Sequence, residues 1–376
     1  MYTARLLAIL LMLTFTTVNA LADSCSSIDL RPALGAPRDQ GDTGWCFSHT
    51  AADLLSVKLK KRISAYDLAI SHHLADLKKL ENSPHAEVRE HLRQNNLIPR
   101  IRDERIGESD DPGAPYVQAK NFFRVSKANG ETTHKGLIGM GGSEDVAILM
   151  GQERGFCLAD QLEGQRSDAD FLRRIKGYHQ SRGREPLGRG FHDYGIASEP
   201  EAQRMAESVI KYADLRCQPR IRPREPIVPY IRMYGKGVQD FRKQVKAGTI
   251  DKTQAQKNVW GDIDKLLEQG EATTIGYDAY DISPPDAGAQ HGDHSSVIAG
   301  RKMMNGQCHY FLRNSWGKDC SIYTAKFKSR CDKNAGGVWL KKSELPSLYS
   351  VVSLSKPRDN SFAPASNEAP ETDARD

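Results

Sequence analysis

Cys46 is the residue of this chain whose type and setting first suggest chemistry. From Gly44 to Leu59 the apolar residues recur every three to four positions, which predicts an amphipathic helix with the cysteine at its start. The backbone N–H groups at a helix start and the positive end of its dipole favour thiolate over thiol. The sequence therefore predicts a nucleophilic sulfur, with a buried structural cysteine or half of a disulfide as the alternative.

A histidine and an asparagine far along the chain complete this constellation. His294 begins an apolar run that ends at Gly300, and Asn314 and Trp316 follow the next such run. An imidazole can take the proton of a thiol, while an asparagine oxygen accepts from the other ring nitrogen and fixes the tautomer. We expect His294 to be the base, Asn314 to orient it and Trp316 to shield their hydrogen bond. His291 is the alternative base.

The elements that must position these residues divide the chain into a helical half and a stranded half. Helical patterns cover residues 44–59, 65–80 and 143–154, the last with Ser143 as N-cap and two acids in its first turn. Strand-like segments dominate after residue 263, at 273–277, 294–300, 309–313 and 337–340. This segregation predicts an α+β fold of two lobes with a cleft between them.

The constellation resembles the papain-like family of cysteine peptidases, in the chain order Gln40, Cys46, His294, Asn314. The resemblance implies that Cys46 is the nucleophile, His294 the general base and acid, and Asn314 the orienting residue. It also implies an oxyanion hole formed by the Gln40 side chain and the Cys46 backbone N–H. The implied fold has a helical N-terminal lobe and an antiparallel, β-rich C-terminal lobe, with the active site in the cleft between them.

The resemblance also implies which backbone segment the substrate lies along. Gly141 and Gly142 match the backbone along which the family's substrates lie in an extended pose, the alternative being a simple turn. We place Trp316 among the substrate-binding residues as well. Trp45 stands where the family has a small residue, and we expect it to narrow the cleft beside the sulfur.

The chain departs from the family in two respects. Thr43 occupies the position of the family's first signature cysteine, so one of its disulfides is missing here. His294 also lies about 250 residues after Cys46, against roughly 130 to 150 in the family. Insertions at about 95–138 and 157–258 account for the excess, and we expect loops in residues 95–142 and helical pieces in the second insertion.

The termini predict an exported protein. Residues 1–22 have the layout of a secretory signal peptide, with cleavage after Ala22 and an uncleaved anchor as the alternative. The catalytic domain is then expected at 23–355, without a long N-terminal propeptide, and residues 356–376 are expected to be disordered. The destination is secreted or periplasmic.

The seven cysteines suit an oxidising compartment, and their odd number leaves at least one outside any pair within the chain. Six cysteines allow 15 pairings, so the connectivity is open. Spacing favours Cys157 with Cys217 and Cys320 with Cys331.

Composition excludes several function classes. A net charge of +5 is too mild to indicate nucleic-acid binding, and a mean hydropathy of −0.58 excludes a multi-span membrane protein. No metal-binding spacing is present, so we expect neither metal nor organic cofactor. Positive charge gathers at Arg216, Arg220, Arg222, Arg224, Arg232, Arg242 and Lys243. We interpret this cluster as a solvated face, with docking to an anionic surface or partner as the alternative.

The predicted function is an exported cysteine endopeptidase that hydrolyses peptide or protein substrates through a thioester acyl-enzyme. One alternative is an amidase or acyl-transferase that uses the same residues on cell-wall peptides. The other is a secreted binding protein that kept the fold without turnover.

Overall fold

We describe the protein from a computed structural model. The structure describes residues 25–40, 44–74, 80–94, 97, 116–119, 123–126, 136–138, 142–162, 199–284 and 292–358. The expected signal peptide, the tail beyond residue 358, Thr43, Gly141 and His291 lie outside the described residues, so their predictions stay untested.

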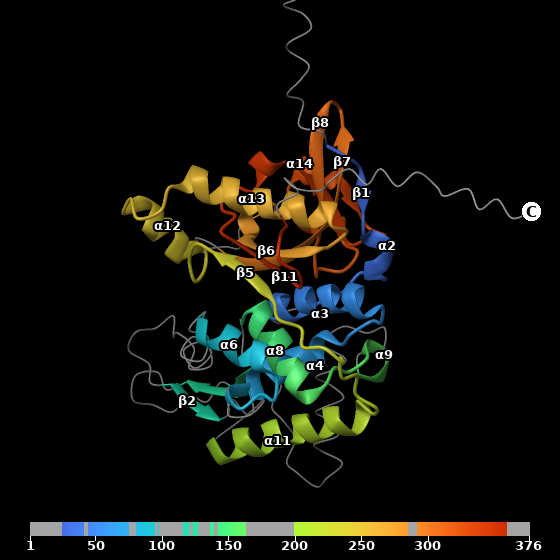
Figure 1. The fold of residues 1–376 in the computed structure, drawn as a ribbon, viewed down its shortest axis with the longest axis vertical. Helices are drawn as coiled ribbons and strands as arrows, with labels where there is room; N and C mark the ends of the chain where they lie inside the picture. Colours follow the sequence, from blue (N-terminus) through green and yellow to red (C-terminus); the bar gives the residue numbers. More distant parts are fainter. Residues whose placement is uncertain are drawn as a thin grey trace, which may run out of the picture.

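The protein has an α+β fold in two lobes, as expected (Figure 1). The helical lobe contains six helices in the described part of the chain: α3 (Cys46–Leu59), α4 (Ala65–Leu74), α6 (Ala86–Gln94), α8 (Glu144–Arg154), α9 (Ala159–Leu162) and α11 (Glu199–Arg216). A small antiparallel sheet of β2 (Tyr116–Ala119), β3 (Phe123–Ser126) and β4 (Gly136–Ile138) lies in the same lobe. These strands occur where we expected loops, because each is only three or four residues long and carries little periodicity.

The second lobe is built on one antiparallel sheet. Its strands are β1 (Ile28–Asp29), β5 (Tyr230–Met233), β6 (Thr273–Asp278), β7 (Asp293–Met304), β8 (Gln307–Arg313), β9 (Cys331–Asp332), β10 (Gly337–Leu340) and β11 (Ser350–Ser353). Their order is β5-β11-β6-β7-β8-β10-β9, with β1 paired to β7. The helices of this lobe are α12 (Val238–Lys246), α13 (Lys252–Glu268) and α14 (Ala325–Lys328), while the short α2 (Arg31–Leu34) follows β1.

The long helix α13 covers one face of this sheet. It begins after Asp251, whose side chain accepts a hydrogen bond from the Gln254 backbone N–H and so caps the helix. Its apolar residues, among them Val259 and Ile263, pack with strand residues in one core. The elements β5, α12 and the start of α13 all belong to this lobe, so residues 230–258, at the end of the second expected insertion, are part of its structure.

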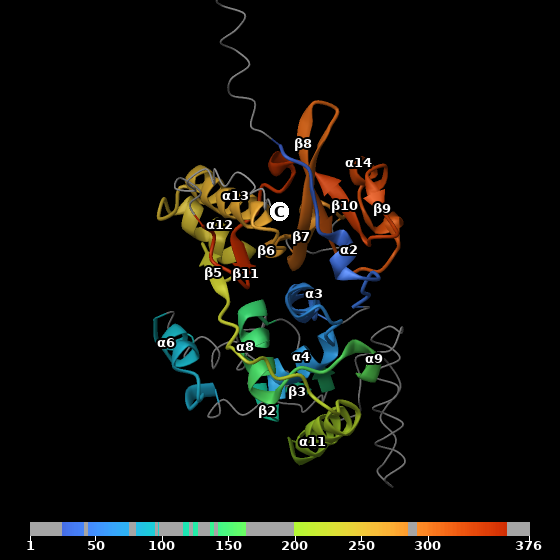
Figure 2. The same ribbon diagram turned by 45° about the vertical axis from the view of Figure 1, so that its right-hand side comes forward.

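Helix α3 lies between the two lobes (Figures 1 and 2). Its buried residues Phe47, Ala51 and Leu55 share a core with Val297 and Ala299 of β7. The helix that starts at the predicted nucleophile is therefore packed directly against the strand that starts beside the predicted base.

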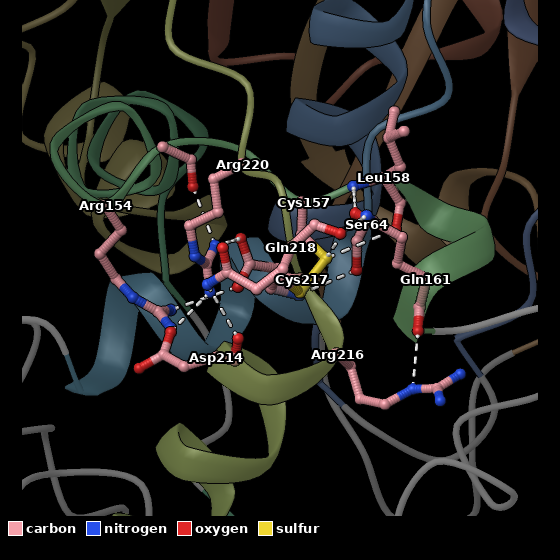
Figure 3. Close-up of a disulfide and its surroundings, with 12 residues drawn as sticks. Ser64, Arg154, Cys157, Leu158, Gln161, Asp214, Arg216, Cys217, Gln218 and Arg220 are labelled. Carbon is pink, nitrogen blue, oxygen red and sulfur yellow. Dashed lines mark hydrogen bonds and ion pairs between the residues drawn. A yellow bond between two sulfur atoms is a disulfide. The ribbon is translucent and has the colours of Figure 1, made fainter.

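Three disulfides account for six of the seven cysteines. Cys157–Cys217 and Cys320–Cys331 confirm the two pairs favoured by spacing, and Cys25–Cys308 is the third. Figure 3 shows the Cys157–Cys217 bridge, which fastens the segment after α8 to the end of α11. Cys46 is the one cysteine left outside a disulfide.

Several of the clustered basic residues bind acids of this same chain. Ion pairs join Arg220 to Asp67 and Asp214, Arg232 to Asp262, and Arg242 to Asp278. Arg154 converges with Arg220 on Asp214, as Figure 3 shows. These ion pairs join different elements of the fold, so less of the arginine charge is available to an anionic partner. Binding of such a partner stays a prediction.

Candidate active site

Cys46 is the first residue of α3, and Trp45 is the N-cap. As a whole residue, Cys46 is half-buried. It accepts a hydrogen bond from the backbone N–H of Ser295, the residue that follows His294 in β7. The fold thus brings the cysteine to the strand segment that carries the histidine, although the chain separates the two widely.

His294 is held by three neighbours. Its Nε2 lies 2.7 Å from Oδ1 of Asn314, which leaves Nδ1 as the ring nitrogen for exchange with a thiol. The imidazole stacks on Trp316, with 4.6 Å between ring centroids, and meets the edge of Tyr277 at 5.7 Å. The structure therefore brings together the predicted base, its orienting residue and the aromatic shield.

The segment that carries Gln40 runs alongside the segment that carries Trp316. The Gln40 backbone N–H donates to the Ser315 carbonyl at 2.7 Å, and the Gly317 N–H donates to the Arg38 carbonyl at 2.8 Å. The Ser315 hydroxyl also donates to Gln40 Oε1, which leaves the amide nitrogen as the donor group of that side chain. Gln40 is consequently held by Ser315, the residue that follows Asn314 in the chain.

Gly142 occupies a position that only glycine fits. Its φ of +145° is one that L side chains rarely adopt, and a Cβ there would lie 2.8 Å from Phe47 and 2.9 Å from His72. The residue is exposed and precedes Ser143, the N-cap of α8, whose backbone N–H points to His72 Nε2 at 3.5 Å. An exposed backbone edge without a side chain is what an extended substrate would need.

Trp45 does not narrow a cleft. Its side chain is fully buried in the core of the helical lobe and packs near Tyr66, with 6.1 Å between ring centroids. The expectation was wrong because an N-cap side chain can turn back under its own helix, which sequence spacing does not report.

The protonation states of Cys46 and His294 differ from expectation, because the sequence predicted a thiolate at Cys46. Burial, followed by the charge of Glu144, raises the pKa of the Cys46 thiol to about 12, although the Ser295 and Phe47 backbone groups act in the opposite direction. Burial lowers the pKa of His294 to about 4, against the hydrogen bond with Asn314. Both groups are therefore neutral at pH 7, because the loss of water outweighs the stabilisation offered by the helix start.

Two side chains at this site escaped the sequence analysis as site residues. The Ser295 hydroxyl donates to Oε1 of Glu144 and lies 3.2 Å from the Thr50 hydroxyl. Glu144 was noticed only as an acid in the first turn of a helix, and a serine next to a histidine carries no signal. Their relation to Cys46 depends on how α3, α8 and β7 meet.

The described residues hold no group of three or more His, Cys, Asp or Glu that could bind a metal ion. None of the helices in the described part of the chain has the length and apolar character required for a membrane span.

A scan against models of protein families matches none, and a search of curated proteins finds no match. Among solved structures, the chain is similar to xylellain, a cysteine protease from Xylella fastidiosa, at 12% identity and a TM-score of 0.37, over 88% of this chain and 86% of that one. It is also similar to procathepsin B S9 from Trypanosoma congolense, at 10% identity and a TM-score of 0.38, over 90% and 80%.

A third similar structure is PepW from Lactobacillus rhamnosus, at 12% identity and a TM-score of 0.38, over 91% of this chain and 84% of that one. Likenesses of this size carry nothing about activity, so the chemistry of this protein has to follow from its own residues.

Proposed function

We propose that this protein is a cysteine peptidase. Cys46 is the nucleophile, His294 the general base and acid, and Asn314 the residue that orients His294. The observation that supports this most directly is the meeting of α3 and β7, where the cysteine outside any disulfide contacts Ser295 and the adjacent His294 is bound to Asn314.

The proposed reaction starts from a neutral thiol and a neutral imidazole, which the raised pKa of Cys46 and the lowered pKa of His294 support. The thiol proton passes to Nδ1 of His294 as the sulfur attacks the peptide carbonyl, so charge separation occurs only once substrate has replaced water. The Gln40 side-chain amide and the Cys46 backbone N–H donate to the oxyanion. The imidazolium then protonates the leaving amine, and a water deprotonated by His294 releases the acyl group from the thioester.

We further propose that substrate lies extended along the backbone at Gly141 and Gly142, against Trp316. Exposure of Gly142 and the stacking of Trp316 on His294 support this placement. Export by a signal peptide ending at Ala22, with residues 23–355 as the catalytic domain, is part of the same proposal, and three disulfides fit an oxidising compartment. N-terminal sequencing of the exported protein tests the cleavage site.

Active-site titration with an epoxide inhibitor of cysteine peptidases tests the proposed nucleophile. We expect one equivalent to attach to Cys46, and Cys46→Ala to abolish both labelling and hydrolysis with its melting temperature unchanged. Hydrolysis by Cys46→Ala equal to wild type would remove the assignment.

A substrate panel then separates the candidate reactions, because the same residues would serve an amidase or acyl-transferase. Unfolded protein and short fluorogenic peptides should be cleaved. Turnover of peptidoglycan fragments alone would assign the amidase or acyl-transferase, and labelling without any turnover would indicate a binding protein.

A further inference from the structure

Glu144, a buried acid of the helical lobe, binds Ser295, the residue of β7 that directly follows the proposed base His294. Glu144, the first residue of α8, accepts a hydrogen bond from the Ser295 hydroxyl, and both side chains are buried. Ser295 also hydrogen-bonds the Cys46 sulfur through its backbone N–H. One residue thus connects α8, β7 and the nucleophile.

The same hydroxyl is anchored on the nucleophile helix. Ser295 Oγ lies 3.2 Å from Oγ1 of Thr50, one turn after Cys46. Because the Ser295 hydroxyl donates to Glu144, the Thr50 hydroxyl is the donor in this second contact. Because a buried hydroxyl between a carboxylate and a second hydroxyl has few alternative positions, this contact fixes β7 relative to α3.

We propose that Glu144 and Ser295 form a positioning pair for the reaction: the Glu144 carboxylate holds the Ser295 side chain and so sets how the His294–Ser295 segment lies against Cys46. This inference rests on the proposed function. The pair touches neither substrate nor the reacting proton, so both act through the residues they position.

Glu144 also contributes a negative charge at the sulfur, and other groups share that environment. The titratable groups whose charges act on Cys46 or respond to it are Glu144 from α8, Asp293 from β7, Tyr277 from β6 and Tyr349 just before β11. Replacing Glu144 by glutamine therefore removes one of two nearby carboxylates while an acceptor oxygen for Ser295 remains.

Ser295→Ala and Glu144→Ala test the positioning role. Each breaks the same contact, so each should lower kcat by on the order of tenfold or more, with KM near wild type, because misplacing a reacting group affects the chemical step. The double variant should lose no more than either single variant, because both changes remove the same interaction. Additive losses would overturn the proposal.

Glu144→Gln separates charge from hydrogen bonding. It should retain kcat within a few-fold of wild type, and a loss as large as that of Glu144→Ala would overturn the proposal. Iodoacetamide labelling of Cys46 should become faster by on the order of tenfold at a given pH, since the carboxylate that opposes the thiolate is gone. A labelling profile identical to wild type would show that Glu144 does not face the sulfur and would equally overturn it.

A second serine–glutamate contact at the other end of α8 provides the matched control. Ser83 Oγ donates to Glu153 Oε1 at 2.7 Å, and Ser83 is buried. Ser83→Ala and Glu153→Gln should match wild type in kcat and labelling. If they reproduce the effects at Ser295 and Glu144, the role is general stability and the proposal fails. Labelling of Cys46 does not require turnover, so it also tests the contact in a protein without peptidase activity. If Glu144→Gln is labelled faster than wild type but neither protein cleaves any substrate, the proposed peptidase function is rejected and the contact of Glu144 with the Cys46 site is supported.

Discussion

Arg313 donates from Nε to Oδ2 of Asp53 at 2.8 Å in the interior of the protein. Arg313 directly precedes Asn314, and Asp53 lies about two turns after Cys46 in α3. Arg38, two residues before Gln40, donates from Nε to Oδ1, the other carboxylate oxygen of Asp53, at 2.7 Å. A single buried acid therefore holds together the three chain segments that carry the proposed nucleophile, orienting residue and oxyanion donor.

Asp53→Ala should destabilise the protein by about 3–5 kcal/mol, because it leaves two buried guanidinium groups without their acid. The free energy of unfolding from urea titrations measures the loss. Glu90→Gln, which removes an exposed ion pair with Arg93 within α6, is the control and should change stability little. Equal stability of Asp53→Ala and wild type would contradict the central role of this acid.

Stability should fall in acid because two histidines are neutral in the folded protein. Burial lowers the pKa of His49 to about 3 and that of His294 to about 4, both below the ordinary value of 6.5. The unfolded chain binds these protons first, so stability falls as the pH drops below 6.5, and the loss is complete once the pH has passed about 4 for His294 and about 3 for His49.

Urea titrations between pH 7 and 3.5 check this slope, with His49→Phe as the test variant. The variant should lose part of the pH dependence, because phenylalanine cannot take up a proton. An unchanged slope would show that folding does not lower the pKa of His49.

His294→Ala should lower kcat by roughly 10²–10⁴-fold, the range for removal of a general acid and base. Asn314→Ala should have a smaller effect, on the order of tenfold, since the imidazole remains but loses its fixed orientation. Rates on a fluorogenic peptide provide the measurement, and Ser321→Ala, in an exposed 3-10 helix, is the control. Full activity of His294→Ala would return the role of base to His291.

Gly142→Ala should weaken substrate binding and lower stability, because the added methyl group meets Phe47 and His72 in a conformation that alanine rarely adopts. Gly248→Ala is a close control, with φ of +72° and no atom within 4 Å of the added carbon, so it introduces backbone strain alone. A larger rise in KM and fall in melting temperature for Gly142→Ala are expected. Equal changes in KM and melting temperature for the two variants would contradict the predicted crowding of the added methyl group at position 142.

Local patterns in the sequence predicted much of the fold. The helix at Cys46, the N-cap at Ser143 and the strands around His294 follow from periodicity and capping, and the two shorter-range disulfides follow from spacing. The types and order of Gln40, Cys46, His294 and Asn314 likewise suggested one kind of chemistry. The helices, caps and strands among these features are decided by residues near each other in the chain.

Other features were decided by the packing of distant segments. Sequence placed a thiolate at a helix start, whereas the surrounding protein removes water from Cys46 and sets Glu144 beside it, so the thiol stays protonated. The contact of Glu144 with Ser295, the burial of Trp45 and the Cys25–Cys308 bridge arise in the same way. Periodicity reports which face of an element is apolar, but desolvation and charge depend on which elements meet, and only the tertiary structure determines that.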